Sequence, residues 1–187
     1  MFPSRLNIKL NFFQLFLLVF IFSSNNIIGQ EDSSMSSSEN TMTSVYNDVW
    51  LPFMESYREL NIEKFKSLQA NDLTRVSIDR NTIQTKSKYF DEIDGFFMQI
   101  QQANREMDIK FSMLSTATGD GKVYQTGYYC ISSRGSNSES FQPMGYGFFT
   151  VVLIKKEGKW KISLDADKQA TIDENEFRKS DVIYELE

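Results

Sequence analysis

The sequence contains no histidine and only one cysteine, Cys130, among its 187 residues. Without histidine the chain cannot form a Ser-His-Asp or Cys-His catalytic arrangement, or a metal site that depends on imidazole ligands. A single cysteine cannot form an intramolecular disulfide, so a folded domain must be held together by its hydrophobic core. No histidine is available to activate the thiol of Cys130, which favours a buried structural role for it over a nucleophilic one.

The chain is acidic over most of its length. It holds 20 Lys and Arg against 25 Asp and Glu, and no acidic residue precedes Glu31. Since Arg5 and Lys9 are the basic residues before that point, 18 basic residues face 25 acidic ones from Glu31 onward, a formal charge of −7. The sequence shows no basic stripe, and an acidic domain is poorly suited to a polyanion, so nucleic acid is not an expected partner.

Residues 1–29 have the three parts of a secretory signal peptide. Arg5 and Lys9 give a positive start, residues 10–22 form an apolar centre, and Gly29 supplies a small residue at the exit. We therefore predict cleavage and export to the periplasm or the extracellular space. No membrane attachment is expected after cleavage.

A retained membrane anchor is the alternative interpretation of the same segment. A spanning helix needs about 20 mostly apolar residues, and lengthening the apolar run to Ile28 would place the polar residues 23–26 inside the bilayer. This length argument favours cleavage. No cysteine lies near the exit, so acylation of a new N-terminal cysteine is not possible.

The rest of the chain divides into three parts. Residues 30–43 are rich in serine and contain almost no large apolar residue, which predicts a flexible tether. Residues 44–170 are long enough for one hydrophobic core and predict a single domain. Residues 171–187 form an acidic tail in which a short helix is expected over 174–179.

Apolar residues at three- and four-residue spacing predict helices in the first part of the domain. The first such stripe runs from Val45 to Leu60, and Pro52 within it predicts a kink or a new start. Asn61 is positioned to cap a second short helix over 62–69. A third helical stripe follows residue 87 and contains Phe90, Ile93, Phe97 and Ile100.

The period then changes to two, which is typical of strands. One strand is expected early, over 73–79, before a polar loop over 80–87. Four consecutive strands are expected later, and Asp120-Gly121 and Glu157-Gly158 supply hairpin turns; their ranges are 107–114, 123–132, 145–155 and 159–165. Helices followed by a run of strands predict an α+β domain with an antiparallel sheet covered on one face.

This order of elements resembles the nuclear transport factor 2-like superfamily, especially its SnoaL-like and ketosteroid-isomerase-like members. The resemblance rests on Trp50 in the first helix, on Leu73–Asp79, and on the strand–turn–strand segment 147–165 with its Gly-Lys-Trp-Lys-Ile sequence. It covers about residues 44–170. It implies a cone-shaped α+β domain, in which a curved antiparallel sheet wraps around the N-terminal helices and leaves an apolar pocket at the open end. Members of the superfamily use that pocket for catalysis, small-molecule binding or protein docking, and many form dimers.

Two strand-end acids, Asp79 and Asp165, are the candidate catalytic residues. An apolar cavity raises the pKa of a carboxyl group, which suits a base that abstracts a proton beside a tyrosine donor. The alternative is that both acids lie in water or pair with nearby basic residues, which is the commoner role of acids at strand ends. The histidine that some members of the superfamily use in catalysis has no counterpart in this chain.

The candidate pocket residues are mostly aromatic: Trp50, Arg80, Tyr129, Tyr146 and Trp160. Each aromatic residue among them has core packing as its alternative role. Arg80 either anchors an anionic ligand or forms a surface ion pair, and the surface pair is favoured. The acids of segment 165–176 are spaced like those of a calcium loop, but the required glycine is replaced by Ala170. No metal site and no cofactor are predicted.

These observations favour a non-catalytic exported domain that binds a small apolar or amphipathic molecule or forms a homodimer. One alternative is an isomerase or dehydratase that uses a pocket aspartate with a tyrosine. The other is a structural module that docks onto another protein through its sheet.

Signal cleavage has a direct test. When the full-length chain is expressed with an export pathway, mass spectrometry of the exported product should show a protein that begins at Gln30. Leu17→Arg breaks the apolar centre and should prevent processing. Recovery of the intact chain from the membrane fraction would show instead that the segment is a retained anchor.

Overall fold

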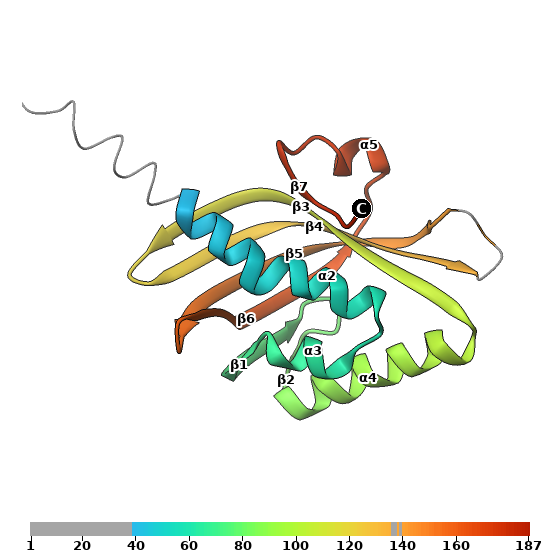
Figure 1. The fold of residues 1–187 in the computed structure, drawn as a ribbon, viewed down its shortest axis with the longest axis horizontal. Helices are drawn as coiled ribbons and strands as arrows, with labels where there is room; N and C mark the ends of the chain where they lie inside the picture. The colour runs from blue at the N-terminus through green and yellow to red at the C-terminus, as the bar shows by residue number, and fades with distance from the viewer. Residues whose placement is uncertain (1–38, 136–137, 139) are drawn as a thin grey trace, which may run out of the picture. The chain divides into compact units, whose positions relative to one another are not determined.

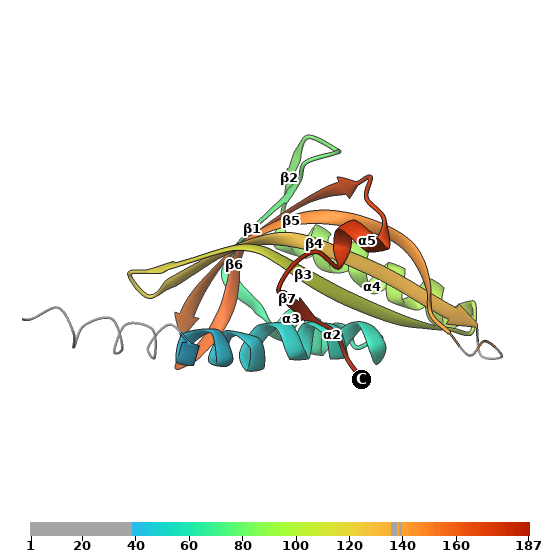
Figure 2. The same ribbon diagram turned by 90° about the horizontal axis from the view of Figure 1, so that it is seen from above.

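The computed structural model describes residues 39–135, 138 and 140–187, and the predicted signal peptide lies outside these residues. They form an α+β domain with a curved seven-stranded sheet, in the order β2-β1-β6-β5-β4-β3-β7 (Figure 1). The helices α2 and α3 and the long helix α4 lie along one side of this sheet, and α5 lies on the other side (Figures 1 and 2). This arrangement confirms the predicted cone-shaped fold.

The first helical segment is longer than the sequence pattern indicated. Residues 39–45 are helical, so five residues assigned to the tether are part of a helix, which continues through η1 (Tyr46–Trp50) and α2 (Leu51–Arg58). Proline lacks an N–H group and its ring clashes with the preceding turn. The helix accommodates Pro52 by widening to π geometry in η1, where the N–H of Leu51 donates to the carbonyl of Tyr46. Among the described residues, no helix is both long and apolar enough to cross a membrane.

The next two helices begin at side-chain caps. The Oδ1 atom of Asn61 accepts a hydrogen bond from the backbone N–H of Lys64 at 3.0 Å, which confirms the predicted cap of α3 (Ile62–Ser67). Thr85 caps α4 (Lys86–Gln102) in the same way. These caps satisfy N–H groups that have no partner within the helix.

The four consecutive strands follow the prediction. They are β3 (Arg105–Gly119), β4 (Lys122–Gly135), β5 (Gln142–Lys156) and β6 (Lys159–Ala170), and each pairs antiparallel with the next. Two tight turns join β3 to β4 and β5 to β6, with positive φ at both turn residues: Asp120 and Gly121, and Glu157 and Gly158. Glycine accepts this conformation without steric cost, which explains the turn positions.

The sheet differs from the prediction at its first strand. β1 (Gln69–Ser77) pairs parallel with β6, so the sheet is mixed, although most of its pairs are antiparallel. β1 also pairs antiparallel with a short strand, β2 (Thr82–Gln84), inside the segment expected to be a loop. The parallel pairing brings the start of the domain beside its last long strand, and this contact positions the site described below.

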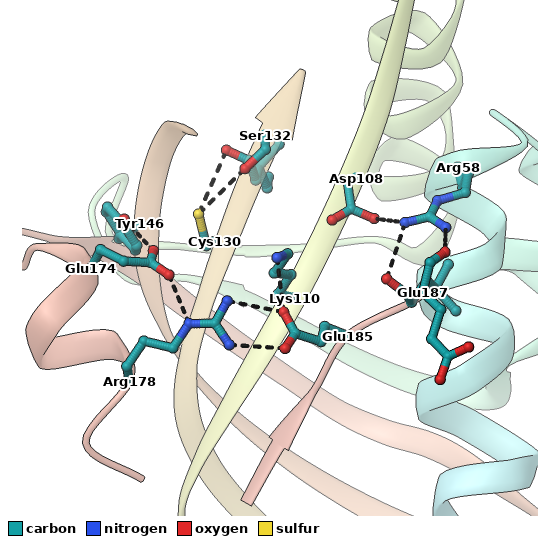
Figure 3. A network of polar contacts seen from close by, with 12 residues as sticks. Arg58, Asp108, Lys110, Cys130, Ser132, Tyr146, Glu174, Arg178, Glu185 and Glu187 are labelled. Carbon is teal, nitrogen blue, oxygen red and sulfur yellow. Dashed lines mark hydrogen bonds and ion pairs between the residues drawn. The ribbon is translucent and has the colours of Figure 1, made fainter. Parts of the chain in front are cut away.

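The acidic C-terminal segment is part of the domain. The predicted short helix is present as α5 (Glu174–Phe177), and β7 (Val182–Tyr184) pairs with β3. Polar contacts fix this segment, as Figure 3 shows. Arg178 and Lys110 bind the carboxylate of Glu185 and lower its pKa to about 2. Arg58 of α2 donates to the carbonyl oxygen of Glu187 at 2.8 Å.

An aromatic core lies between the helices and the sheet. The ring of Trp50 packs at 4.6 Å from that of Phe111 and at 5.4 Å from that of Phe149, measured between centroids. Its indole N–H donates to Oε1 of the buried Gln125 at 2.9 Å. Gln125 in turn donates to the hydroxyl of Thr116 at 3.2 Å. The single polar group of this tryptophan is therefore satisfied inside the core.

Loss of the glutamine acceptor should destabilise the domain. Gln125→Met keeps the side-chain length but leaves the indole N–H of Trp50 buried without a partner, at an expected cost of about 1–3 kcal/mol in the free energy of unfolding. Chemical denaturation of Gln125→Met, Trp50→Phe and the double variant measures the coupling between the two residues. Because the double variant has no orphaned donor, it should be more stable than the sum of the single effects predicts. Strict additivity would show that the hydrogen bond contributes nothing.

Candidate functional site

A cavity of about 540 Å³ lies between the helices and the sheet. Every helix of the N-terminal half except the short α3 contributes to its wall, as do all the long strands. Most of the lining side chains are apolar or aromatic, and the charged ones come from β1, from the turn after it and from β6. The lining residues are Trp50, Phe53, Tyr57, Arg75, Arg80, Tyr89, Ile93, Phe96, Ile109, Phe111, Tyr129, Ile131, Phe149, Val151, Asp165, Asp167 and Gln169.

The charged group of the cavity is built by the parallel pairing of β1 with β6. In this register Arg75 is the partner of Asp165, and Ser77 is the partner of Asp167. Residues two apart in a strand point to the same face of the sheet, so both aspartates of β6 reach the Arg75 side chain. Its Nη1 atom lies 3.0 Å from Oδ1 of Asp165, and its Nη2 atom lies 2.6 Å from Oδ1 of Asp167.

Two tyrosine hydroxyls complete this charged group. Tyr89 of α4 donates to Oδ2 of Asp165 at 2.7 Å, and its ring lies 4.6 Å from the guanidinium carbon of Arg75. Tyr129 of β4 donates to Oδ2 of Asp167 at the longer distance of 3.3 Å. We call these five residues, Arg75, Tyr89, Tyr129, Asp165 and Asp167, the polar cluster.

Burial shifts the protonation equilibria of the cluster. Removal from water raises the pKa of Asp167, and the neighbouring Asp165 raises it further, while Arg75 acts in the opposite direction. Burial alone would lower the pKa of Arg75, but the attraction of Asp165 and Asp167 outweighs it, so the guanidinium remains charged. Burial and the charge of Asp165 raise the pKa of Tyr89, which keeps its hydroxyl protonated as a donor.

A glycine positions the ring of Tyr129. Gly147 of β5 is the cross-strand partner of Tyr129, and a Cβ atom added to it would lie 2.1 Å from Cζ of that ring. The ring therefore lies directly over the glycine backbone. Any side chain at position 147 would displace the ring and, with it, the hydroxyl that reaches Asp167.

The mouth of the cavity carries a second ion pair. Arg80 lies in the turn between β1 and β2, and its guanidinium binds both carboxylate oxygens of Glu92 on α4, at 3.2 and 2.9 Å. Its Nε atom donates to the hydroxyl of Ser77 at 2.9 Å. The Gln84 side chain also donates to Glu92. Arg80 is thus engaged with a helix and is not paired with its neighbour Asp79.

The structure brings some of the predicted site residues together and separates others. Trp50, Arg80, Tyr129 and Asp165 line the cavity. Asp79 is exposed and accepts a hydrogen bond from the backbone N–H of Gln169.

The two other predicted pocket residues lie elsewhere in the described domain. The indole N–H of the buried Trp160 donates to the hydroxyl of Ser44 at 2.9 Å. The hydroxyl of Tyr146 donates to Glu174, and its ring packs on Phe177 of α5. Both side chains stabilise the attachment of flanking segments to the sheet.

Sequence reasoning missed two central residues, Arg75 and Asp167. The alternation of the first strand was recognised, but Arg75 was assigned to the polar face. The strand that contains Asp165 continues to Ala170, so Asp167 shares a face with Asp165. The spacing Asp-Ala-Asp on a strand was the available signal. Within the residues described, no cluster of three or more cysteine, aspartate or glutamate side chains forms a potential metal site.

Comparison with solved structures supports the fold. The domain superposes on a protein from Catenulispora acidiphila with a TM-score of 0.59 and 14% identity, over 72% of this chain and 94% of that one. The corresponding values for ActVI-ORFA from Streptomyces coelicolor are 0.57 and 8%, over 75% and 98%. For Aln2 from another Streptomyces species they are 0.56 and 10%, over 70% and 90%. These matches show a nuclear transport factor 2-like fold. No family model and no curated protein matches the sequence.

The raised pKa of Asp167 predicts a pH-dependent stability difference. Since its pKa in the folded domain lies above the value of about 3.9 in an unfolded chain, the native state loses stability as the pH rises through this range. Asp167→Asn removes that loss and should raise the free energy of unfolding at pH 7 by roughly 0.5–2 kcal/mol. The advantage should shrink as the pH falls towards 4, in denaturation curves measured at several pH values.

Asp79→Asn is the matched control, because it makes the same chemical change at an exposed site. Its stability difference from the unmodified domain should vary much less with pH. A destabilised Asp167→Asn variant at pH 7 would show that the ion pair with Arg75 outweighs the burial cost.

Proposed function

We propose that this domain is exported and binds a small amphipathic molecule in the cavity between its helices and its sheet. The observation that supports this most directly is the cavity itself, whose volume of about 540 Å³ falls in the usual range for small-molecule sites. If side chains filled the cone completely, no ligand could enter. The domain instead combines an open apolar interior with one group of charged residues.

The division of the lining supports an amphipathic ligand over a purely apolar one. Trp50, Phe111 and Phe149 form a continuous aromatic wall that would bury an apolar body. The polar cluster faces the same space from β1, β4, β6 and α4. Convergent polar groups in an otherwise apolar pocket orient a ligand and provide specificity.

Proton-transfer catalysis is the second candidate function. It is favoured by the burial of Asp167, which raises the pKa of this carboxyl group beside the Tyr129 hydroxyl. A carboxylate in such surroundings serves as a base, and a tyrosine stabilises the enolate that forms. An isomerase or dehydratase of this kind would use Asp167 in place of the exposed Asp79. Turnover of a ligand that Asp167→Asn still binds but no longer converts would support it.

Binding of a neutral probe tests the primary proposal. 2-Naphthalenemethanol combines an aromatic body with one hydroxyl group and is small enough for the cavity. Isothermal titration calorimetry should show saturable binding with one site per domain. Ile131→Trp places a larger side chain in the cavity wall and should weaken or abolish this binding.

Leu114→Trp is the matched control, since Leu114 is half exposed on β3 and is not part of the cavity lining. It should bind the probe as the unmodified domain does. Thermal melting of both variants confirms that they fold. Equal binding by the two variants, or no binding to the unmodified domain, would contradict the proposal.

A further inference from the structure

We infer that the ligand of this cavity carries a protonated amine, which binds beside Asp167 against the rings of Phe149 and Tyr129. This inference rests on the proposed binding function and adds the chemical class of the ligand. It comes from three features of the site: the charge balance, the unequal use of the two aspartates, and the position of the aromatic rings.

The charges around the cavity do not cancel. Arg75 is paired with Asp165 and Asp167, and Arg80 at the mouth is paired with Glu92. Two cations therefore face three anions, which leaves one negative charge at the polar end. Because interactions between charges are stronger in a water-poor cavity than in bulk solvent, this excess favours a positively charged ligand group and disfavours an anionic one.

The excess charge lies on Asp167. Both oxygens of Asp165 accept close hydrogen bonds, at 3.0 Å from Arg75 and 2.7 Å from Tyr89. In Asp167 only Oδ1 has a close partner, because the 3.3 Å contact of Oδ2 with Tyr129 is longer than the usual 2.5–3.0 Å of an O–H···O bond. The Asp167 side chain is also more accessible, at 25% exposed against 10% for Asp165. A ligand donor can therefore approach Oδ2 of Asp167.

Aromatic rings flank this carboxylate. Phe149 of β5 is the direct cross-strand partner of Asp167, and Tyr129 reaches it through its hydroxyl. The faces of aromatic rings carry partial negative charge and attract organic cations. An ammonium group at Oδ2 would thus gain a charged hydrogen bond and ring contacts, which together offset its loss of hydration.

Three ligands with one aromatic body test this inference: 2-naphthylmethylamine as its ammonium ion, 2-naphthalenemethanol and 2-naphthoate. Calorimetry at neutral pH should show the ammonium ion binding about tenfold or more tightly than the alcohol, as expected for a hydrogen bond to a charged group. The naphthoate should bind most weakly. If the alcohol binds and the ammonium ion does not bind better, the cation assignment is wrong and the binding function stands. If none of the three binds, the binding function itself fails.

Variants then locate the preference. Asp167→Asn should abolish the advantage of the ammonium ion over the alcohol and keep the binding of the alcohol. Asp79→Asn removes the same charge at an exposed position and should leave the advantage unchanged. Tyr129→Phe keeps a ring and frees Oδ2, so the advantage should persist or increase. An ammonium preference that survives Asp167→Asn, or one that is lost in Asp79→Asn, would overturn the assignment.

Discussion

The buried guanidinium of Arg75 is the contact on which the remaining arrangement depends. It joins β1 to β6, and it lies between two carboxylates that would otherwise repel each other in an apolar interior. Its side chain is only 7% exposed. Buried ions are costly unless they are paired and hydrogen-bonded, and here the pairing coincides with the parallel strand contact. The same interaction that closes this side of the cone also sets the charge of the cavity.

The cavity survives because its wall is supported on both sides. The indole of Trp50 is fixed by Gln125 from β4, while Tyr57 and Phe65 pack edge to face with Phe97 of α4. These contacts hold the helices away from the polar cluster. An unfilled apolar space costs stability because its lining atoms lose packing partners. A binding role accounts for that cost, since a bound ligand would restore the missing contacts.

Local patterns predicted much of this fold, and long-range pairings accounted for the errors. Turn residues and alternation located the four consecutive strands, and Asn61 was recognised as a helix cap from its type and position. The parallel contact of β1 with β6 joins residues about ninety positions apart, and no local pattern specifies such a pairing. Asp167 was missed for the same reason, because its importance follows from the position of Arg75. Asp165 was found because it ends a clear alternating run, whereas Asp79 ends a similar run and points into water.

The short strand β7 affects how this domain meets its surroundings. The free edge of a long strand offers unpaired N–H and C=O groups on which another chain can add a strand. β7 covers this edge of β3 at residues 111–113, and Arg178 and Lys110 fix the segment that provides the cover. Through β7, the acidic end of the chain shields the sheet against edge-to-edge association, a form of protection that a domain without disulfide bonds has to build from its own backbone.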